Sequence, residues 1–223
     1  MLLKAKNINK TYKNKEFEDL IIFKNLNFEV NDENITTIYG PSGVGKSTLL
    51  NILGTVDSPD SGTIELDNIP FSSKNFYKLR RQFISYMFQF HYLLPEFTIY
   101  DNLKLVLEIK NIYHKSSPVI FETLDRFGIA DKAKNYPHHL SGGEKQRVSL
   151  ARSIISSPSI VLADEPTGNL DNENSMMIAE EIKKISNESS IKFIIASHDT
   201  IFENISDRVC CIKKFNIFDM NQK

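Results

Sequence analysis

The chain has 223 residues, of which 27 are Lys or Arg and 28 are Asp or Glu, so its formal net charge is -1. This length suits one domain with a sizeable core, and 41% hydrophobic residues indicate a globular chain rather than a disordered one. The near-neutral charge balance gives no electrostatic reason to expect nucleic acid as a partner. We therefore expect a single domain over residues 1–223 that binds no nucleic acid.

The sequence also argues against membrane insertion and disulfide bonding. No stretch approaches the roughly 18 apolar residues that a membrane helix needs. Lys4 and Lys6 lie where a signal peptide would have its apolar core. Cys210 and Cys211 are adjacent, so they close no useful disulfide loop and fit a reducing compartment. We expect a cytosolic protein that reaches any membrane only through a partner.

The first third of the chain predicts strands and one helix. Residues 2–12 and 21–30 alternate apolar and polar side chains, which is typical of half-buried antiparallel strands. Residues 34–40, "NITTIYG", form a β-rich run, and 47–54, "STLLNILG", have helical spacing. A further alternating strand is expected at 62–68. These segments predict an antiparallel β subdomain near the N-terminus.

Helical patterns dominate the middle of the chain. Thr98, followed three residues later by Asp101, resembles a capping box at a helix start. Pro118 lies near the start of a second predicted helix, which Gly128 ends. The predicted helices cover 99–112, 117–127 and 144–155. We place a helical subdomain at roughly 89–156, inserted between β-rich segments.

Two nearly continuous apolar runs follow, at 159–165 and 191–199, as expected for strands buried on both faces of a parallel sheet. Residues 172–188 between them have helical periodicity, which completes a strand–helix–strand unit. The buried face of that helix is expected to hold Met177, Ile178, Ile182 and Ile185. The fold class is therefore α/β, with a mostly parallel sheet beside the antiparallel and helical subdomains.

Residues 40–48, "GPSGVGKST", match the phosphate-loop pattern G-x-x-x-x-G-K-[ST] between a predicted strand and helix. The glycines let the backbone wrap phosphates, Lys46 reaches the β- and γ-phosphates, and the Ser47 hydroxyl is placed for Mg²⁺. The candidate ATP-binding residues of the loop are Gly40, Pro41, Ser42, Gly43, Val44, Gly45, Lys46, Ser47 and Thr48. The core is thus predicted to be that of a P-loop NTPase, with ATP and Mg²⁺ as cofactors.

A second set of polar residues fits the same chemistry. Asp164 ends a predicted buried strand, where open α/β sheets place ligand-binding groups, and its carboxylate suits Mg²⁺. Glu165 would face the γ-phosphate and polarise an attacking water. Gln89 and His198 carry little signal as single residues. The helix start at 141–143, "SGG", offers further N–H groups to an anion.

Taken in order, these elements resemble the nucleotide-binding subunit of ABC transporters over essentially the whole chain. "LSGGEKQ" at 140–146 is the family signature, and "NLD" follows at 169–171. The resemblance implies that Tyr12 stacks on adenine, that Gln89 senses Mg²⁺ and the attacking water, and that His198 contacts the γ-phosphate. The implied catalytic residues are Lys46, Gln89, Glu165 and His198. The implied Mg²⁺ ligands are Ser47, Gln89 and Asp164. The implied ATP contacts outside the phosphate loop are Tyr12, Ser141, Gly142, Gly143 and Asp171.

In this family two cassettes pack head to tail, and each ATP lies between one subunit's phosphate loop and the other's signature. Ser141 and the N–H groups at 142–144 would therefore cap a γ-phosphate bound by a second copy of the chain. ATP would hold the dimer together and hydrolysis would let it open, which drives integral membrane transporter subunits.

The stretches at 49–62 and 89–102 resemble the lipoprotein-releasing branch of ABC exporters, whose ATPase subunits lie on the cytoplasmic face of the inner membrane. Macrolide-type efflux ATPases and the bacterial cell-division ATPase are alternatives. An ABC ATPase that works on ribosomes or DNA is disfavoured, because the chain has one cassette, no heptad run and no basic excess. The signature excludes a nucleoside-monophosphate kinase.

Two stretches leave alternatives open. Apolar side chains around Pro95 either pack in the core or line a groove for a partner's short helix. They are Phe88, Phe90, Tyr92, Leu93, Leu94 and Phe97. The last stretch, 210–223, lacks the Asp-Gly turn that commonly joins the final two strands in the family, which leaves the sheet edge undefined.

Overall fold

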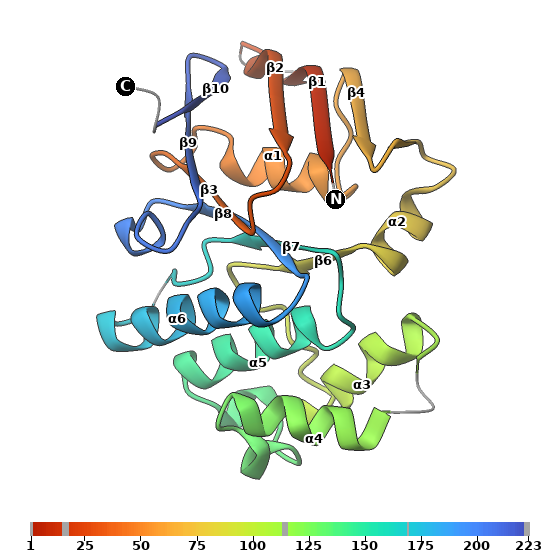
Figure 1. The fold of residues 1–223 in the computed structure, drawn as a ribbon, viewed down its shortest axis with the longest axis vertical. Coiled ribbons are helices and arrows are strands. Elements are labelled where there is room, and N and C mark those ends of the chain that lie inside the picture. Colours follow the sequence, from red (N-terminus) through yellow and green to blue (C-terminus); the bar gives the residue numbers. More distant parts are fainter. Residues whose placement is uncertain (1, 15–17, 113–115, 169, 221–223) are drawn as a thin grey trace.

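The computed structural model describes residues 2–14, 18–112, 116–168 and 170–220 (Figure 1). The strands are β1 (Leu3–Tyr12), β2 (Leu20–Val30), β3 (Ile35–Tyr39), β4 (Ser61–Leu66), β5 (Ile69–Pro70), β6 (Ile84–Met87), β7 (Ile160–Asp164), β8 (Lys192–Ser197), β9 (Arg208–Lys213) and β10 (Asn216–Asp219). The α-helices are α1 (Lys46–Leu53), α2 (Phe76–Gln82), α3 (Ile99–Ile109), α4 (Ser116–Arg126), α5 (Gly142–Ile154) and α6 (Asn172–Glu188). Short 3₁₀ helices are η2 (Ala130–Lys132), η3 (Pro137–His139) and η4 (Thr200–Phe202).

The strands form two sheets, as the alternating and continuous apolar patterns predict. The smaller sheet is antiparallel, with strand order β2–β1–β4–β5. The larger has the order β10–β9–β3–β8–β7–β6, and its pairs are parallel except for β9 with β10. Figure 1 shows α1 between the two sheets, α5 and α6 on the opposite face of the larger sheet, and α3 and α4 farthest from the antiparallel sheet. The predicted α/β fold class is confirmed.

Strand β8 shows why the central strands read as continuous apolar runs. Phe193 and Ile195 belong to the hydrophobic core on the side of α5 and α6, whereas Ile194 and Ala196 belong to the core beneath the antiparallel sheet. Successive side chains of a strand point to opposite faces, so a strand covered on both faces is apolar at every position. The larger sheet thereby joins two hydrophobic cores.

The predicted helix boundaries follow from capping. The Thr98 side chain accepts the Asp101 amide at the start of α3, and Gly128 adopts a left-handed φ of 64° two residues after α4. On α6 the buried face includes Ile178, Ile182 and Ile185, as predicted. The expectation for Met177 was wrong, because its side chain is 42% exposed. Ser175 and Ala179 lie on the buried face of α6 instead.

Helix α2 and strand β6 were not predicted from the sequence. The stretch 76–87 carries aromatic and basic side chains without a clear period, and α2 buries only Leu79 among its described residues. Strand β6 is short and takes its place at the sheet edge through parallel pairing with β7. Tertiary pairing therefore decides the structure where local pattern is weak.

The C-terminal strands form a hairpin although the chain has no Asp-Gly turn there. Strands β9 and β10 pair in register from Lys213–Asn216 to Cys210–Asp219. The two residues between them, Lys214 and Phe215, both adopt left-handed φ values, 47° and 68°. This is the backbone of a type I′ turn, which normally selects Asn and Gly. The Phe215 carbonyl accepts the Lys24 amide at 3.2 Å, which ties the hairpin to β2.

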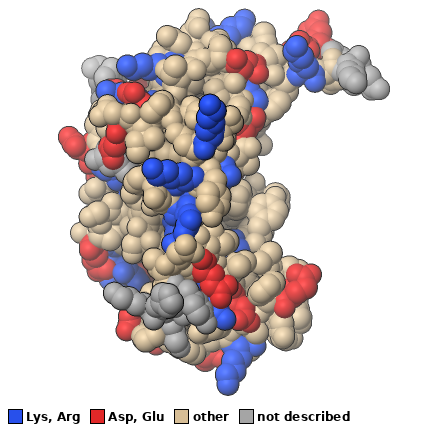
Figure 2. Space-filling view, turned by 90° about the vertical axis from the view of Figure 1, so that its right-hand side faces the viewer, with Lys and Arg blue, Asp and Glu red and all other residues tan. Residues whose placement is uncertain are grey.

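No described helix is long and apolar enough to cross a membrane. Figure 2 shows acidic and basic side chains interspersed over one face of the molecule, in keeping with the net charge of -1.

The strained hairpin gives a stability prediction. Lys214→Asn places a residue that tolerates left-handed φ at the first turn position, so we expect a gain of about 0.5 kcal/mol and a Tm higher by about 1–2 °C. Lys213→Asn, one residue earlier in the exposed part of β9, is the matched control and should not stabilise. Thermal denaturation followed by circular dichroism measures both; an unchanged or lower Tm for Lys214→Asn would contradict the turn assignment.

Candidate nucleotide-binding site

The start of α1 has no side-chain cap: Gly45 has no side chain to offer, and the first turn of α1 contains no acidic residue. Helix α2 also starts without a side-chain cap. By contrast, α3, α5 and α6 are capped by the side chains of Thr98, Ser141 and Asp171. The positive end of α1 is thus left without a side-chain acceptor, which suits an anion such as a phosphate group.

Glycine is required at position 45 for a packing reason. Its φ is 109°, and a Cβ built there would lie 2.8 Å from Ile22 Cγ2 and 3.1 Å from Phe23 Cε1. The phosphate loop therefore packs directly against β2, with backbone where another residue would have a side chain. This contact fixes the position of the phosphate loop between the two sheets.

Lys46 holds its charge inside the loop. Its Nζ donates to the Gly40 carbonyl at 2.7 Å and to the Pro41 carbonyl at 3.2 Å, and it lies 3.1 Å from Oε1 of Glu165. The residue is only 5% exposed. The ammonium group is thus aimed at the region where the loop would hold phosphates, with a carboxylate opposite.

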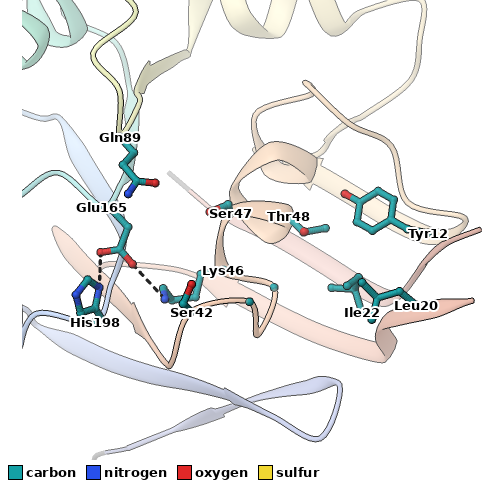
Figure 3. A pocket seen from close by; sticks show the side chains of 12 residues that line it. Tyr12, Leu20, Ile22, Ser42, Lys46, Ser47, Thr48, Gln89, Glu165 and His198 are labelled. Carbon is teal, nitrogen blue, oxygen red and sulfur yellow. Dashed lines mark hydrogen bonds and ion pairs between the residues drawn. The ribbon is translucent and has the colours of Figure 1, made fainter. Parts of the chain in front are cut away.

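Glu165 is fixed on the opposite wall by four neighbours. It follows β7 with a left-handed φ of 44°, and its amide donates to the Ala196 carbonyl at 2.8 Å. Oε2 lies 2.9 Å from Nδ1 of His198 and accepts from the Ser197 hydroxyl at 3.3 Å. Figure 3 shows Glu165 between Lys46 and His198, with Gln89 beside it. These contacts orient the carboxylate, and the residue is only 8% exposed.

Ser47 and Asp164 form a pair of oxygen groups at the other side of the loop. The Ser47 hydroxyl donates to Oδ1 of Asp164 at 2.9 Å. Burial raises the pKa of Asp164, an effect that the Ser47 hydrogen bond and Lys46 oppose. No cluster of three or more His, Cys, Asp or Glu side chains in the described part of the chain could hold a metal ion by itself. A hydroxyl and one carboxylate fit Mg²⁺, which takes its other ligands from phosphates and water.

A cavity of about 330 Å³ joins these groups. Its walls bring together most of the predicted site residues, from elements far apart in the sequence (Figure 3). The predicted residues that line it are Tyr12, Ser42, Gly43, Gly45, Lys46, Ser47, Thr48, Gln89, Glu165 and His198. Leu20 and Ile22 of β2 complete the wall and were not predicted. Their place in the alternating pattern of β2 did not distinguish them from ordinary strand residues. In the structure, however, Leu20 is 59% exposed at the start of the strand, and an exposed apolar side chain can indicate a ligand-binding surface.

Tyr12 lies at the end of the cavity away from Glu165 (Figure 3). Its hydroxyl donates to Oδ2 of Asp57 at 2.9 Å, and Lys10 Nζ lies 4.9 Å from the ring centroid. The residue is 40% exposed. An anchored aromatic ring beside Leu20 and Ile22 forms a flat apolar wall suited to a planar base.

Other predicted residues lie elsewhere. Gly40 and Pro41 direct their carbonyls at Lys46, and Val44 packs against the core beneath the antiparallel sheet. Among the described residues, the lining of the cavity does not include Ser141, Gly142, Gly143 or Asp171. Asp171 caps α6 by accepting the Asn174 amide at 2.8 Å.

The signature helix start is ordered by its own residues. Ser141 Oγ accepts the Glu144 amide at 3.3 Å, and Oε2 of Glu144 accepts the Ser141 amide at 2.8 Å. Hydrogen bonds from the Ser141 amide and from its side chain lower the pKa of Glu144, so the two residues hold each other in place. Gly143 lies so close to Asn174 that an added Cβ would come within 2.5 Å of Oδ1. The signature is therefore an ordered helix start that lies outside the lining of the cavity with the phosphate loop.

The apolar run after β6 divides between core and surface. Leu93 packs against the hydrophobic core, and Phe88 stacks on Tyr86 with ring centroids 4.1 Å apart. The exposed members are Phe90, Tyr92, Leu94 and Phe97. A second cavity, of about 500 Å³, is lined by Asn51, Val56, Phe88, Gln89, Phe90, Tyr92 and Asp164. Gln89 and Asp164 place this second cavity next to the phosphate loop.

A phosphate loop facing an oriented carboxylate, on this two-sheet fold, defines a P-loop ATPase. The ABC transporter family model matches residues 23–168, and the chain belongs to that family. The lipoprotein-releasing system ATP-binding protein LolD 2 of Chlorobium chlorochromatii (strain CaD3) is 38% identical over 221 residues, covering 95% of this chain and 92% of the relative. The LolD protein of Buchnera aphidicola subsp. Acyrthosiphon pisum (strain APS) is 40% identical over 203 residues, covering 89% of each.

Solved structures agree with this assignment. The dimeric structure of MJ0796, a bacterial ABC transporter cassette, has a TM-score of 0.88 at 33% identity and covers 99% of this chain and 100% of that one. A post-hydrolysis dimer of the same cassette, bound to ADP and Pi, has a TM-score of 0.88 at 31% identity, with the same coverage. The predicted family and its ATPase activity are confirmed, and the chain is an ABC ATPase homologous to LolD subunits.

The Ser47–Asp164 pair yields a prediction with opposite effects on stability and binding. A carboxyl whose folded pKa is raised loses stability as pH rises and it ionises, so Asp164→Asn should raise the Tm of the nucleotide-free protein at pH 7. That gain should shrink as pH falls through about 4 and should vanish below about pH 3, where Asp164 is protonated in both the folded and the unfolded state. The same change should weaken Mg²⁺-dependent ATP binding at least about tenfold.

Thermal shift with and without Mg²⁺ and ATP measures both effects. Asp131→Asn, at a carboxylate whose side chain is 70% exposed, is the control and should change neither. A Tm that drops at pH 7, with Mg²⁺ dependence intact, would contradict the assigned role of Asp164.

Proposed function

We propose that this ABC ATPase drives integral membrane subunits that release lipoproteins from the inner membrane. The observation that carries the proposal is the naming of similar chains: relatives of about 38–40% identity, covered almost end to end, are lipoprotein-releasing ATP-binding proteins. The chain then acts as a peripheral subunit on the cytoplasmic face, and it contributes one cassette, with a helical insertion at roughly 89–156, to the energy-coupling dimer.

In the proposed complex with ATP, the adenine lies against Tyr12 and the apolar pair Leu20 and Ile22. The phosphates lie over the uncapped start of α1, where backbone amides and Lys46 neutralise their charge. Lys46 then exchanges part of its interaction with Glu165 for the β- and γ-phosphates. ATP binding would therefore weaken the ion pair between Lys46 and Glu165, which leaves the Glu165 carboxylate available to contact a water molecule.

Mg²⁺ would be held by Ser47 and Asp164, with Gln89 near enough in the cavity lining to respond to it. When bound, the ion would neutralise charge that develops on the phosphate oxygens. The pair of protein oxygens is the part of this site that the chain itself supplies.

Glu165 is the proposed general base. Its carboxylate polarises the attacking water, and His198 and Ser197 hold Oε2 so that Oε1 faces the phosphate side. His198 stands at the mouth of the cavity with a side chain 67% exposed, where it can also donate to a γ-phosphate. Catalysis here depends on orientation and electrostatics more than on covalent chemistry.

The active state is proposed to be a dimer with composite sites. Ser141, Gly142 and Gly143 lie outside the cavity of their own chain but form an ordered helix start. In a head-to-tail pair they would cap the γ-phosphate on the partner copy, with Asp171 at the same interface. The dimeric state of the similar cassette supports this arrangement.

The second cavity and its exposed aromatic rim are proposed to receive a short helix of the membrane subunit. Phe90 and Tyr92 are 65% and 61% exposed, and they border a hollow of about 500 Å³. Gln89 lines both this hollow and the nucleotide cavity, so one residue lies between the partner and ATP. We define residues Phe90, Tyr92, Leu94 and Phe97 as the docking surface.

Composite sites predict complementation between two inactive variants. Lys46→Ala damages the phosphate loop, and Ser141→Asp keeps the helix cap but sets a negative charge against the γ-phosphate. In a mixed dimer one site would carry both lesions and the other would carry neither. We therefore expect about one trapped ATP per mixed dimer and none in either homodimer, measured with radiolabelled nucleotide.

Ser141→Asn keeps the cap without the charge and is the matched control, which should trap ATP as a homodimer. Failure to trap ATP in verified mixed dimers would mean that each chain builds its own complete site.

The proposed role in lipoprotein release predicts which membrane proteins bind this chain. The tagged chain, isolated from membranes of its native host in mild detergent, should bring with it membrane subunits of a lipoprotein-releasing transporter, identified by mass spectrometry. Leu94→Glu on the docking surface should reduce their recovery about tenfold or more, because it sets a charge in an apolar contact. Recovery of a drug-efflux or cell-division partner instead would overturn the lipoprotein assignment while leaving the ATPase assignment unchanged.

A further inference from the structure

The turn at His91 and Tyr92 has an unfavourable backbone. Both residues adopt left-handed φ values, 61° and 43°, which side chains with a Cβ rarely adopt. Such a conformation persists where surrounding contacts fix it, and it is common in switch segments. The turn carries Phe90 and Tyr92 of the docking surface and follows Gln89 of the nucleotide cavity.

Arg152 of α5 supplies those contacts. Its NH1 group donates to the Tyr92 carbonyl at 2.7 Å, and its NH2 group donates to the His91 carbonyl. One guanidinium thus holds the two consecutive carbonyls of the turn with both arms of its fork. Burial lowers the pKa of Arg152 to about 10, so the group stays charged at neutral pH.

The turn also lies along one face of α5. Burial, together with the charges of Lys145 and Arg152, lowers the pKa of His91. Lys145 and Arg152 are seven residues apart, which is about two helical turns, so they lie on the same face. The turn therefore faces α5, and the two Arg152 hydrogen bonds attach it there.

The other end of the same segment is held by a different helix. Asn102 of α3 is only 2% exposed, accepts the Leu94 amide at 2.8 Å and donates to the Leu94 carbonyl at 3.1 Å. Its amide group also contacts the carbonyls of Phe97 and Thr98. The hydrogen bonds from this segment to the helix that begins at the signature thus come from its tip, at residues 91–92.

We propose that Arg152 is a positioning residue that makes the turn at 91–92 follow α5, so that capture of a γ-phosphate by Ser141 repositions Phe90 and Tyr92. This deepens the proposed function, on which it rests, by naming the connection between the signature and the docking surface. Rigid α5 carries the displacement from its N-terminus to Arg152, and the two hydrogen bonds pass it to the turn.

The chain has no tryptophan, so Tyr92→Trp gives a single fluorescent reporter on the turn. In a Glu165→Gln background, which removes the proposed base and retains ATP, acrylamide quenching of the introduced indole is compared with ATP and with ADP. We expect quenching to differ between the two nucleotides when Arg152 is present. Arg152→Met keeps the apolar stem without donors and should reduce this difference at least about fivefold.

Arg152→Lys retains one donor and should restore part of the difference. Arg80→Met is the matched control, because Arg80 also donates to the carbonyl of a left-handed residue, Thr55, at 2.8 Å, but lies on α2. ATP affinity and ATP-driven dimerisation, measured on the same samples, should stay within about twofold in the Arg152 variants, because the hydrogen bonds lost lie outside the nucleotide cavity.

The outcomes distinguish a failure of the link through Arg152 from a failure of the proposed function. Dimerisation with ATP but no nucleotide-dependent change in the reporter fluorescence, or an equal loss in Arg80→Met, overturns the link through Arg152. A full response in Arg152→Met overturns it as well. Absence of ATP-driven dimerisation in the Glu165→Gln parent counts against the proposed function itself, and the link through Arg152 falls with it.

Discussion

The close contact between the Gly45 backbone and β2 is the constraint on which the site depends. Because Ile22 and Phe23 occupy the space where a Cβ would be, the phosphate loop is pressed against the antiparallel sheet. That packing sets the start of α1 beside Leu20 and Ile22, so one contact defines both the phosphate end and the apolar end of the cavity. It also leaves Gly45 without a side-chain cap, and the helix keeps its positive end for the ligand. Packing and electrostatics of the site thus have one origin.

The contrast between two helix starts is the physical basis of the proposed composite sites. Helix α1 has an uncapped start inside a cavity, whereas α5 has a start completed by Ser141 and Glu144 outside that cavity. A preformed cap costs little further ordering on binding, so the proposed capture of a partner's phosphate by the signature would require little rearrangement. The two starts are complementary halves that a head-to-tail pair would bring together.

Sequence reasoning reached the motifs and the fold class because both depend on local signals. The phosphate loop and the helix caps are local chemistry, and β8 is apolar at every position because it is covered on both faces. Features set by contacts distant in sequence were missed or misjudged. Leu20 and Ile22 line the cavity only because β2 passes under Gly45. Met177, by contrast, was misjudged for a local reason: the buried face of α6 runs through Ser175, Ile178, Ala179 and Ile182, which turns Met177 outward. The hairpin at Lys214 and Phe215 shows the same limit in the backbone. Its turn residues are poor choices for left-handed φ, so the pairing of β9 with β3 and the Lys24 hydrogen bond must hold the hairpin in place.

Arg152 is comparable, because its role depends on carbonyls about sixty residues earlier in the chain. No local pattern distinguishes it from an ordinary arginine near a helix end.

Helix α5 contacts two segments that border the candidate nucleotide-binding site, and these contacts determine how a local event could become a movement. Ser141 at its start faces outward, Gln146 one turn later donates to the Pro166 carbonyl beside Glu165, and Arg152 holds the turn at 91–92. Gln146 is completely buried, so this part of the helix is anchored next to Glu165, the proposed general base. In the proposed mechanism, displacement of Ser141 rotates α5 about Gln146, and the Arg152 end then displaces the proposed docking surface. Such a rotation requires no change inside α5, so in this proposal a phosphate bound at one end of the helix acts on the other end.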